Sequence, residues 1–189
     1  PRARGTDRRG QLPNMTPIDE RPAEVATRTV PGHWEGGLIK GARNGSAVGT
    51  LVERTTRLVI LARMDGTDAT SARQGVIKKL RHVPALLRKT LTYDRGKEMA
   101  EHAQLAQRLA IQIFFADPYS PWQRGTNENT NGLLRQYLPK GTDLSGYTQR
   151  ELNAIAHRLN TRPRKCLNLA TPLEVYAHLR HPSPVALGT

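Results

Sequence analysis

The chain has 189 residues, and its 29 Lys and Arg against 16 Asp and Glu give it a formal net charge of +13. A positive field of this size favours a polyanionic partner, above all nucleic acid, but it separates neither DNA from RNA nor a binder from an enzyme. Cys166 is the only cysteine, which excludes an intrachain disulfide and a cysteine-rich zinc module and favours a reducing compartment.

The first 30 residues carry Arg, Pro, Gly and Thr without hydrophobic periodicity. This composition predicts a basic N-terminal arm or linker that is flexible or lies along the surface. No apolar secretory stretch follows it, and no run in the chain approaches the ~20 apolar residues of a membrane span. We therefore expect a cytoplasmic protein with no membrane partner, one folded domain over 31–180 and a short tail over 181–189.

Three strand candidates follow the arm. They cover residues 34–40, 48–53 and 57–64, and are separated by a Gly/Asn turn and by the tripeptide Arg54-Thr55-Thr56. Connections this short join antiparallel neighbours, so the segment predicts a three-stranded meander. We interpret Asp65 and Asp68, which come after the third strand, as turn and helix-cap residues.

Helices and strands then alternate. Apolar residues at helical spacing predict one helix from about Ala72 to Leu80, with Asp68 or Thr70 as its N-cap, and another over 99–109. Buried strands are expected over 90–94 and 111–116. Further helices are predicted near 126–137, 149–159 and 171–179. The order βββαβαβ is that of the ribonuclease H-like fold, an α/β fold whose five-stranded mixed sheet is flanked by helices. Here a helical C-terminal extension follows it.

Enzymes with this fold cut phosphodiesters with two divalent ions, held by carboxylates from the first strand, the end of the fourth strand and a late helix. Asp94 ends the predicted fourth strand, and Glu128 lies in the first turn of the helix near 126–137. The alternatives are an N-cap role for Asp94 and, for Glu128, an acid favoured in a first turn by the helix macrodipole.

Longer motifs surround these acids: LTYDRG at 91–96, PYSPWQRGTNEN at 118–129 and LNTRPRK at 159–165. Together they closely resemble the DDE transposases of the insertion-sequence family numbered thirty, relatives of retroviral integrases, over about residues 32–179. The resemblance implies cleavage and joining of double-stranded DNA at insertion-sequence ends with two Mg²⁺ or Mn²⁺ ions. It also implies a bacterial, nucleoid-associated protein that acts as a homodimer on DNA and carries an N-terminal helix-turn-helix region at full length.

The first strand departs from this family, which has His-Trp-Glu-Gly-Asp where this chain has HWEGG at 33–37. Gly37 therefore stands at the first catalytic Asp position, with Asp94 and Glu128 as the remaining catalytic metal ligands. We expect the chain to fold and bind DNA but to cut poorly or not at all. A deliberate substitution, natural decay and replacement by Glu35 are three explanations. The third is the least favoured, because Glu35 lies about 6.6 Å away along the same strand face.

Basic and aromatic residues near the motifs are candidates for DNA contact. Lys97, Arg124, Arg135 and Lys140 are expected to contact phosphates, and Trp122 with Tyr119 either stacks on an unpaired base or anchors its loop. A later basic track contains Arg158, Arg162, Arg164 and Lys165. His33, His157 and Cys166 are expected to be structural. Two alternative functions stay open: a nuclease of the same fold that cuts without joining, and a non-catalytic DNA-binding module.

Overall fold

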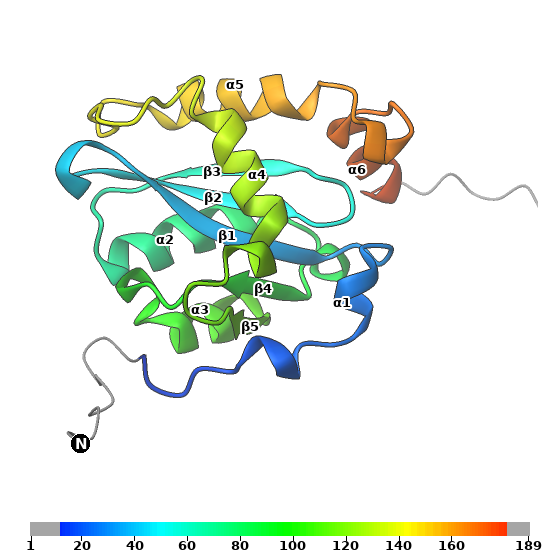
Figure 1. The fold of residues 1–189 in the computed structure, drawn as a ribbon, viewed down its shortest axis with the longest axis horizontal. Coiled ribbons are helices and arrows are strands. Elements are labelled where there is room, and N and C mark those ends of the chain that lie inside the picture. Colours follow the sequence, from blue (N-terminus) through cyan, green and yellow to red (C-terminus); the bar gives the residue numbers. More distant parts are fainter. Residues whose placement is uncertain (1–11, 181–189) are drawn as a thin grey trace, which may run out of the picture.

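A five-stranded mixed sheet forms the centre of the computed structural model, which describes residues 12–180 (Figure 1). The strands are β1 (His33–Lys40), β2 (Ala47–Glu53), β3 (Val59–Arg63), β4 (Thr90–Tyr93) and β5 (Gln112–Phe115). Their order across the sheet is β3-β2-β1-β4-β5. β1, β2 and β3 pair antiparallel, whereas β4 is parallel to both β1 and β5. The predicted order, three antiparallel strands and then two parallel ones, is confirmed.

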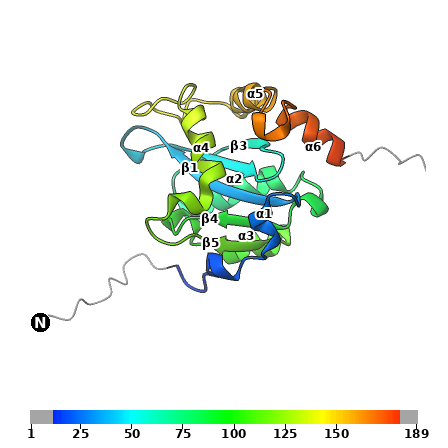
Figure 2. The same cartoon turned by 45° about the vertical axis from the view of Figure 1, so that its right-hand side comes forward.

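Helices cover both faces of this sheet (Figures 1 and 2). The longer ones are α2 (Ala69–Leu80), α3 (His102–Leu109), α4 (Gly125–Leu134), α5 (Gln149–Asn160) and α6 (Pro172–Arg180). α2 and α3 lie together on one face, α4 crosses β1 and β2 on the other, and α5 packs against β3. The Asp68 side chain accepts a hydrogen bond from Ser71 N at the start of α2, which confirms its predicted role as a cap.

Side-chain alternation along β1 divides the core into two clusters. Trp34 belongs to the cluster beneath α2 and α3, where it is fully buried and its Nε1 donates to Leu87 O at 2.8 Å. Ile39 belongs to the cluster beneath α4 and α5. Glu35 and Gly37 share the face of Ile39, because residues two apart on a strand point to the same side. α4 therefore covers the part of β1 that carries positions 35 and 37.

A glycine lets β4 lie close against β1. A Cβ atom at Gly36 would lie 2.5 Å from two ring carbons of Tyr93, so a larger residue would have to displace that buried ring. Tyr93 is the last residue of β4. Its packing therefore fixes the point at which Asp94 leaves the sheet.

Residues 12–30 of the predicted arm run along the folded domain. They include a short helix, α1 (Glu24–Thr27), and their side chains of Leu12, Ile18 and Val25 are buried. Phe115 N donates to Thr16 O at 2.9 Å, which joins the segment to the edge strand β5. This part of the chain is bound to the sheet edge by apolar burial and backbone hydrogen bonds.

His33 connects that segment to the sheet. Its Nδ1 lies 2.9 Å from Thr90 Oγ1 and its Nε2 lies 3.1 Å from Glu24 Oε1. Burial lowers the pKa of His33, and the Glu24 carboxylate opposes that shift. Both ring nitrogens are engaged by side chains from α1 and β4, as a structural role requires.

Residues 1–11 of the predicted arm and the predicted tail at 181–189 lie outside the described residues. Across 12–180, no helix has both the length and the apolar character needed to cross a membrane.

Candidate active site

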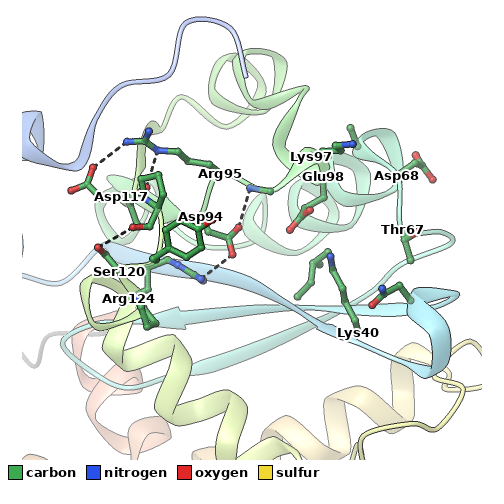
Figure 3. A pocket seen from close by; sticks show the side chains of 18 residues that line it. Lys40, Thr67, Asp68, Asp94, Arg95, Lys97, Glu98, Asp117, Ser120 and Arg124 are labelled. Atoms are coloured by element: carbon green, nitrogen blue, oxygen red, sulfur yellow. Dashed lines mark hydrogen bonds and ion pairs between the residues drawn. The ribbon is translucent and has the colours of Figure 1, made fainter. Parts of the chain in front are cut away.

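Asp94 and Glu128 converge on one guanidinium group. Arg124 Nη2 lies 2.9 Å from Asp94 Oδ2 and 3.1 Å from Glu128 Oε1. The two acid side chains are 47% and 42% exposed, whereas that of Arg124 is 8% exposed. The arginine therefore forms the floor of the site, and the two carboxylates stand at its open side. Figure 3 shows the contact of Arg124 with Asp94.

Arg124 is held in place from both directions. Its Nη1 donates to Gly36 O on β1 at 2.8 Å. It ends a short 3₁₀ turn (Pro121–Arg124), and Gln123 just before it accepts a hydrogen bond from Asp117 N at 2.7 Å. Arg95 donates to the Asp117 carboxylate at 3.1 Å, which ties the same loop to the end of β4 (Figure 3). The position of the guanidinium is thus built into the loop before α4.

A side chain at position 37 would point toward the guanidinium of Arg124. A Cβ atom added there would lie 2.5 Å from Asn127 Oδ1 and 3.1 Å from Arg124 Nη1. Asn127 is fully buried, its Nδ2 donates to Thr50 Oγ1 at 2.9 Å, and its Oδ1 accepts from Asn131 Nδ2 at 3.1 Å. The amide of Asn127 therefore fills the space that a side chain at position 37 would enter.

Glu35 is committed to a different role. Its carboxylate is fully buried, its Oε2 accepts from Asn127 N at 2.8 Å, and its Oε1 lies 3.3 Å from Arg54 Nη1. Burial lowers the pKa of Arg54 to about 10, and the charge of Glu35 acts against that shift. A carboxylate on the first-turn amides of α4 also suits the positive end of the helix dipole. Glu35 therefore anchors the start of α4.

The residues present do not fit a two-ion metal centre. Within 12–180, no group of three or more His, Cys, Asp or Glu side chains is arranged to hold a metal ion. Hard divalent cations require several oxygen ligands, and here Asp94 and Glu128 provide two carboxylates while Gly37 provides no side-chain oxygen. The positive charge between the two acids is that of Arg124.

Two open cavities border the acid pair. One of about 780 Å³ contains Asp94, Lys97 and the 98% exposed Tyr119 in its wall. The other, of about 370 Å³, is lined by Glu128, Arg135 and Lys140 together with Asp94 and Arg124. The structure therefore brings four of the predicted DNA contacts to the edges of the acid pair: Lys97, Arg124, Arg135 and Lys140.

The other predicted contacts line neither of these two cavities. Trp122 is 72% exposed on the turn before α4. Arg162 stacks over the Tyr137 ring at 5.9 Å, and Lys165 is exposed after α5. Arg164 lines a different cavity, on the other flank of α4.

Sequence reasoning missed two residues of the site. Both are buried and both contact Glu35: Asn127 through its backbone N–H in the first turn of α4, and Arg54 through its guanidinium. Asn127 lies within the PYSPWQRGTNEN motif at 118–129, and its place directly before Glu128 is the signal that could have identified it. Arg54 looked like an ordinary turn residue, and no local pattern distinguishes it.

The chain is similar in sequence to known proteins. The Integrase core domain family matches residues 28–121. The transposase of insertion sequence element IS1086 from Cupriavidus metallidurans is 62% identical over 179 residues, covering 95% of this chain and 53% of the relative. That of element IS30A from Escherichia coli is 49% identical over 162 residues, with 86% and 42% covered. The chain spans about half the length of the curated relatives it matches.

Solved structures give the fold. The simian T-cell lymphotropic virus intasome, in complex with a PP2A regulatory subunit, contains a chain with a TM-score of 0.61 and 20% identity, covering 84% of this chain and 57% of that one. The catalytic core domain of BIV integrase has a TM-score of 0.58 and 18% identity, with 80% and 97% covered. The ribonuclease H-like fold is confirmed. The match to the integrase core and the relatives among insertion-sequence transposases support the predicted relationship to the DDE transposases of the IS30 family.

Proposed function

We propose that the chain is the catalytic core of an insertion-sequence transposase that acts on double-stranded DNA as a homodimer, with its strand cleavage and strand transfer impaired by Gly37. One observation carries the proposal. Positions 37, 94 and 128 come from β1, the end of β4 and α4, and all three contact or point at the guanidinium of Arg124. Three acids at such a point would suit phosphoryl transfer, and this chain has two of them.

The parent reaction consists of two phosphoryl transfers. Water attacks the phosphodiester at the element end, and the freed 3′-hydroxyl then attacks the target DNA. Mg²⁺ or Mn²⁺, when bound, supplies charge stabilisation for such a reaction. In this chain Asp94 and Glu128 have the right ligand type, but Arg124 already neutralises part of their charge. We therefore expect weak divalent-ion binding and little or no cutting.

The Arg124 contact also favours a second function, which is DNA binding without cleavage. An arginine between the two acids leaves Lys97, Arg135 and Lys140 around them available for DNA phosphates. Such a module would bind DNA with a steep salt dependence that neither divalent ions nor Asp94→Ala would change.

Nicking and joining assays test the proposal. The unaltered chain and Gly37→Asp are compared for nicking of supercoiled plasmid and for joining of pre-cut ends, each with Mn²⁺ and with EDTA. We expect metal-dependent products from Gly37→Asp alone, and none from Gly37→Asp combined with Asp94→Asn. Nicking without joining would favour a hydrolytic nuclease. Equal activity of the unaltered chain would show that another acid completes the site, and would contradict the role given to Gly37.

A further inference from the structure

A further pocket lies on the other flank of α4 from Glu128. It has a volume of about 330 Å³, and its wall includes Arg28, Arg57 and Arg164 together with Thr126, Asn129 and Thr130. No residue of this wall is acidic. We call it the arginine pocket, after its three arginines. Its charged residues are all cationic, whereas the cavities around Asp94 are lined by both acidic and basic residues.

The three arginines come from three separate parts of the chain. Arg28 follows α1, Arg57 lies in the turn between β2 and β3, and Arg164 lies after α5. Arg28 and Arg57 both have left-handed backbone conformations, with φ of 56° and 64°. Non-glycine residues adopt this conformation infrequently, so the fold holds the two side chains here at some conformational cost.

Among the described residues, two of these arginines contact neutral oxygen atoms. Arg57 Nη1 donates to Thr126 Oγ1 at 2.9 Å, and Arg164 Nη2 donates to Leu159 O at 3.3 Å. Within residues 12–180, no ion pair joins Arg28, Arg57 or Arg164 to a carboxylate. Most of the donor capacity of the pocket is therefore left for a ligand.

The arginines also repel one another. Burial lowers the pKa of Arg164, and the charges of Arg162 and Arg57 lower it further. Folding has brought like charges together here without an internal anion, which destabilises the empty pocket. An anion that bridges the guanidinium groups would remove this repulsion.

The start of α4 also lies in this wall. Gly125 and Thr126, the first residues of this 10-residue helix, line the pocket, while the Glu35 carboxylate accepts from the N–H of the third residue, Asn127. The preference for an anion therefore rests on the planar guanidinium forks, which suit phosphate oxygens. Thr126 Oγ1 accepts from Arg57, so its own hydroxyl proton is available to donate.

We propose that the arginine pocket binds one backbone phosphate of DNA and thereby positions a strand across the start of α4. This inference rests on the proposed function, because that function supplies the DNA. Asn129 in the wall directly follows Glu128, and neighbouring residues on a helix differ by about 1.5 Å in height and face different flanks. A strand held by the pocket therefore passes close to the acid pair. The pocket residues position DNA and touch no reacting atom.

The test measures binding of a labelled duplex by fluorescence anisotropy between about 50 and about 200 mM NaCl. Arg57→Gln/Arg164→Gln is compared with Arg81→Gln/Arg108→Gln, which removes the same charge from two exposed positions across the sheet, one directly after α2 and one on α3. We expect the first pair to weaken binding about tenfold or more and to lower the salt slope by about 1, as the loss of one phosphate contact does. Equal effects of the two pairs would overturn the proposal.

A second variant guards against misfolding. Asn129→Glu places a carboxylate at an exposed position in the wall, where it would pair with the arginines. We expect it to raise the melting temperature while weakening duplex binding, a combination that unfolding cannot produce. Unchanged duplex binding by this variant would contradict the proposal.

Inorganic phosphate separates a DNA site from a site for a free anion. If millimolar phosphate raises the melting temperature in an Arg57- and Arg164-dependent way while duplex binding ignores both residues, the pocket serves a free anion and the DNA assignment is wrong. If the unaltered chain binds no duplex, the proposed function fails instead. The phosphate-dependent shift then still decides whether the pocket is an anion site.

Discussion

The two flanks of α4 handle charge in opposite ways. On the Glu128 flank, Arg124 sits between two carboxylates and all three groups are paired within the chain. On the Asn129 flank, Arg28, Arg57 and Arg164 face a cavity whose wall contains no acid. Charges that are paired within the chain attract an external ion weakly, whereas uncompensated charges attract a counter-ion strongly. The comparison fits the proposal that the chain binds DNA through its uncompensated charge, while the acid pair proposed for cutting is partly neutralised by Arg124.

The largest loss of stability is expected from Glu35→Ala, because this change disturbs the start of α4 and therefore both of its flanks. The carboxylate holds Asn127 N and pairs with the buried Arg54, so its loss loosens the start of α4 and leaves a buried charge unpaired. Removing one partner of a buried pair costs about 3–5 kcal/mol. Urea denaturation measures the free energy of unfolding, with Glu101→Ala as a control at a more exposed ion pair, whose loss we expect to matter less. A loss no larger than that of the control would contradict the anchoring role.

Arg124→Gln separates the flanks, since it changes only the one with the acid pair. The variant loses the hydrogen bond to Gly36 O and charged contacts to both acids, which we expect to cost about 1–3 kcal/mol in stability. It also frees the acids, so Mn²⁺ should bind more tightly than to the unaltered chain, as isothermal titration calorimetry can measure. Weaker Mn²⁺ binding in a folded variant would show that the guanidinium does not compete with the ion.

The smallest effect concerns His33, whose contacts hold α1 next to Arg28. Burial lowers the pKa of His33 below the unfolded value near 6.5. As the pH falls below 6.5, the unfolded chain is therefore protonated at this residue before the folded chain is. Stability from the neutral ring is present above about pH 6.5 and is lost as the pH falls toward the lower folded pKa. Urea midpoints at pH 7.5 and 5.5 should therefore differ less in His33→Gln than in the unaltered chain. An unchanged difference would exclude this contribution.

The order of helices and strands could be predicted from the sequence, but the contacts between residues far apart in the chain could not. Strand and helix periodicity located the sheet and put Asp94 directly after β4, because these patterns are local. The contact of Arg124 with both acids depends on how the loop before α4 meets β1, and no local pattern encodes that. The roles of Asp94, Glu128 and Gly37 stay predictions.

Composition also hid the packing of residues 12–30. Their apolar residues Leu12, Ile18 and Val25 follow neither helical nor strand spacing, so the segment resembled a solvated arm. Each is nonetheless buried, because the segment follows an irregular path along the edge of the sheet. Arg57 was missed for a related reason, since its left-handed backbone turns it toward α4 from a short connection.

The most direct test of the central claim is the affinity for Mn²⁺ of the unaltered chain, Gly37→Asp and Gly37→Asn. The two variants place side chains of the same size against Asn127, so only the added carboxylate distinguishes them. We predict that Gly37→Asp binds Mn²⁺ at least about tenfold more tightly than Gly37→Asn, a difference of about 1.4 kcal/mol, and that Asp94→Asn abolishes the gain. Equal affinities of the two variants, or a gain that survives Asp94→Asn, would contradict the assignment of position 37 to this site.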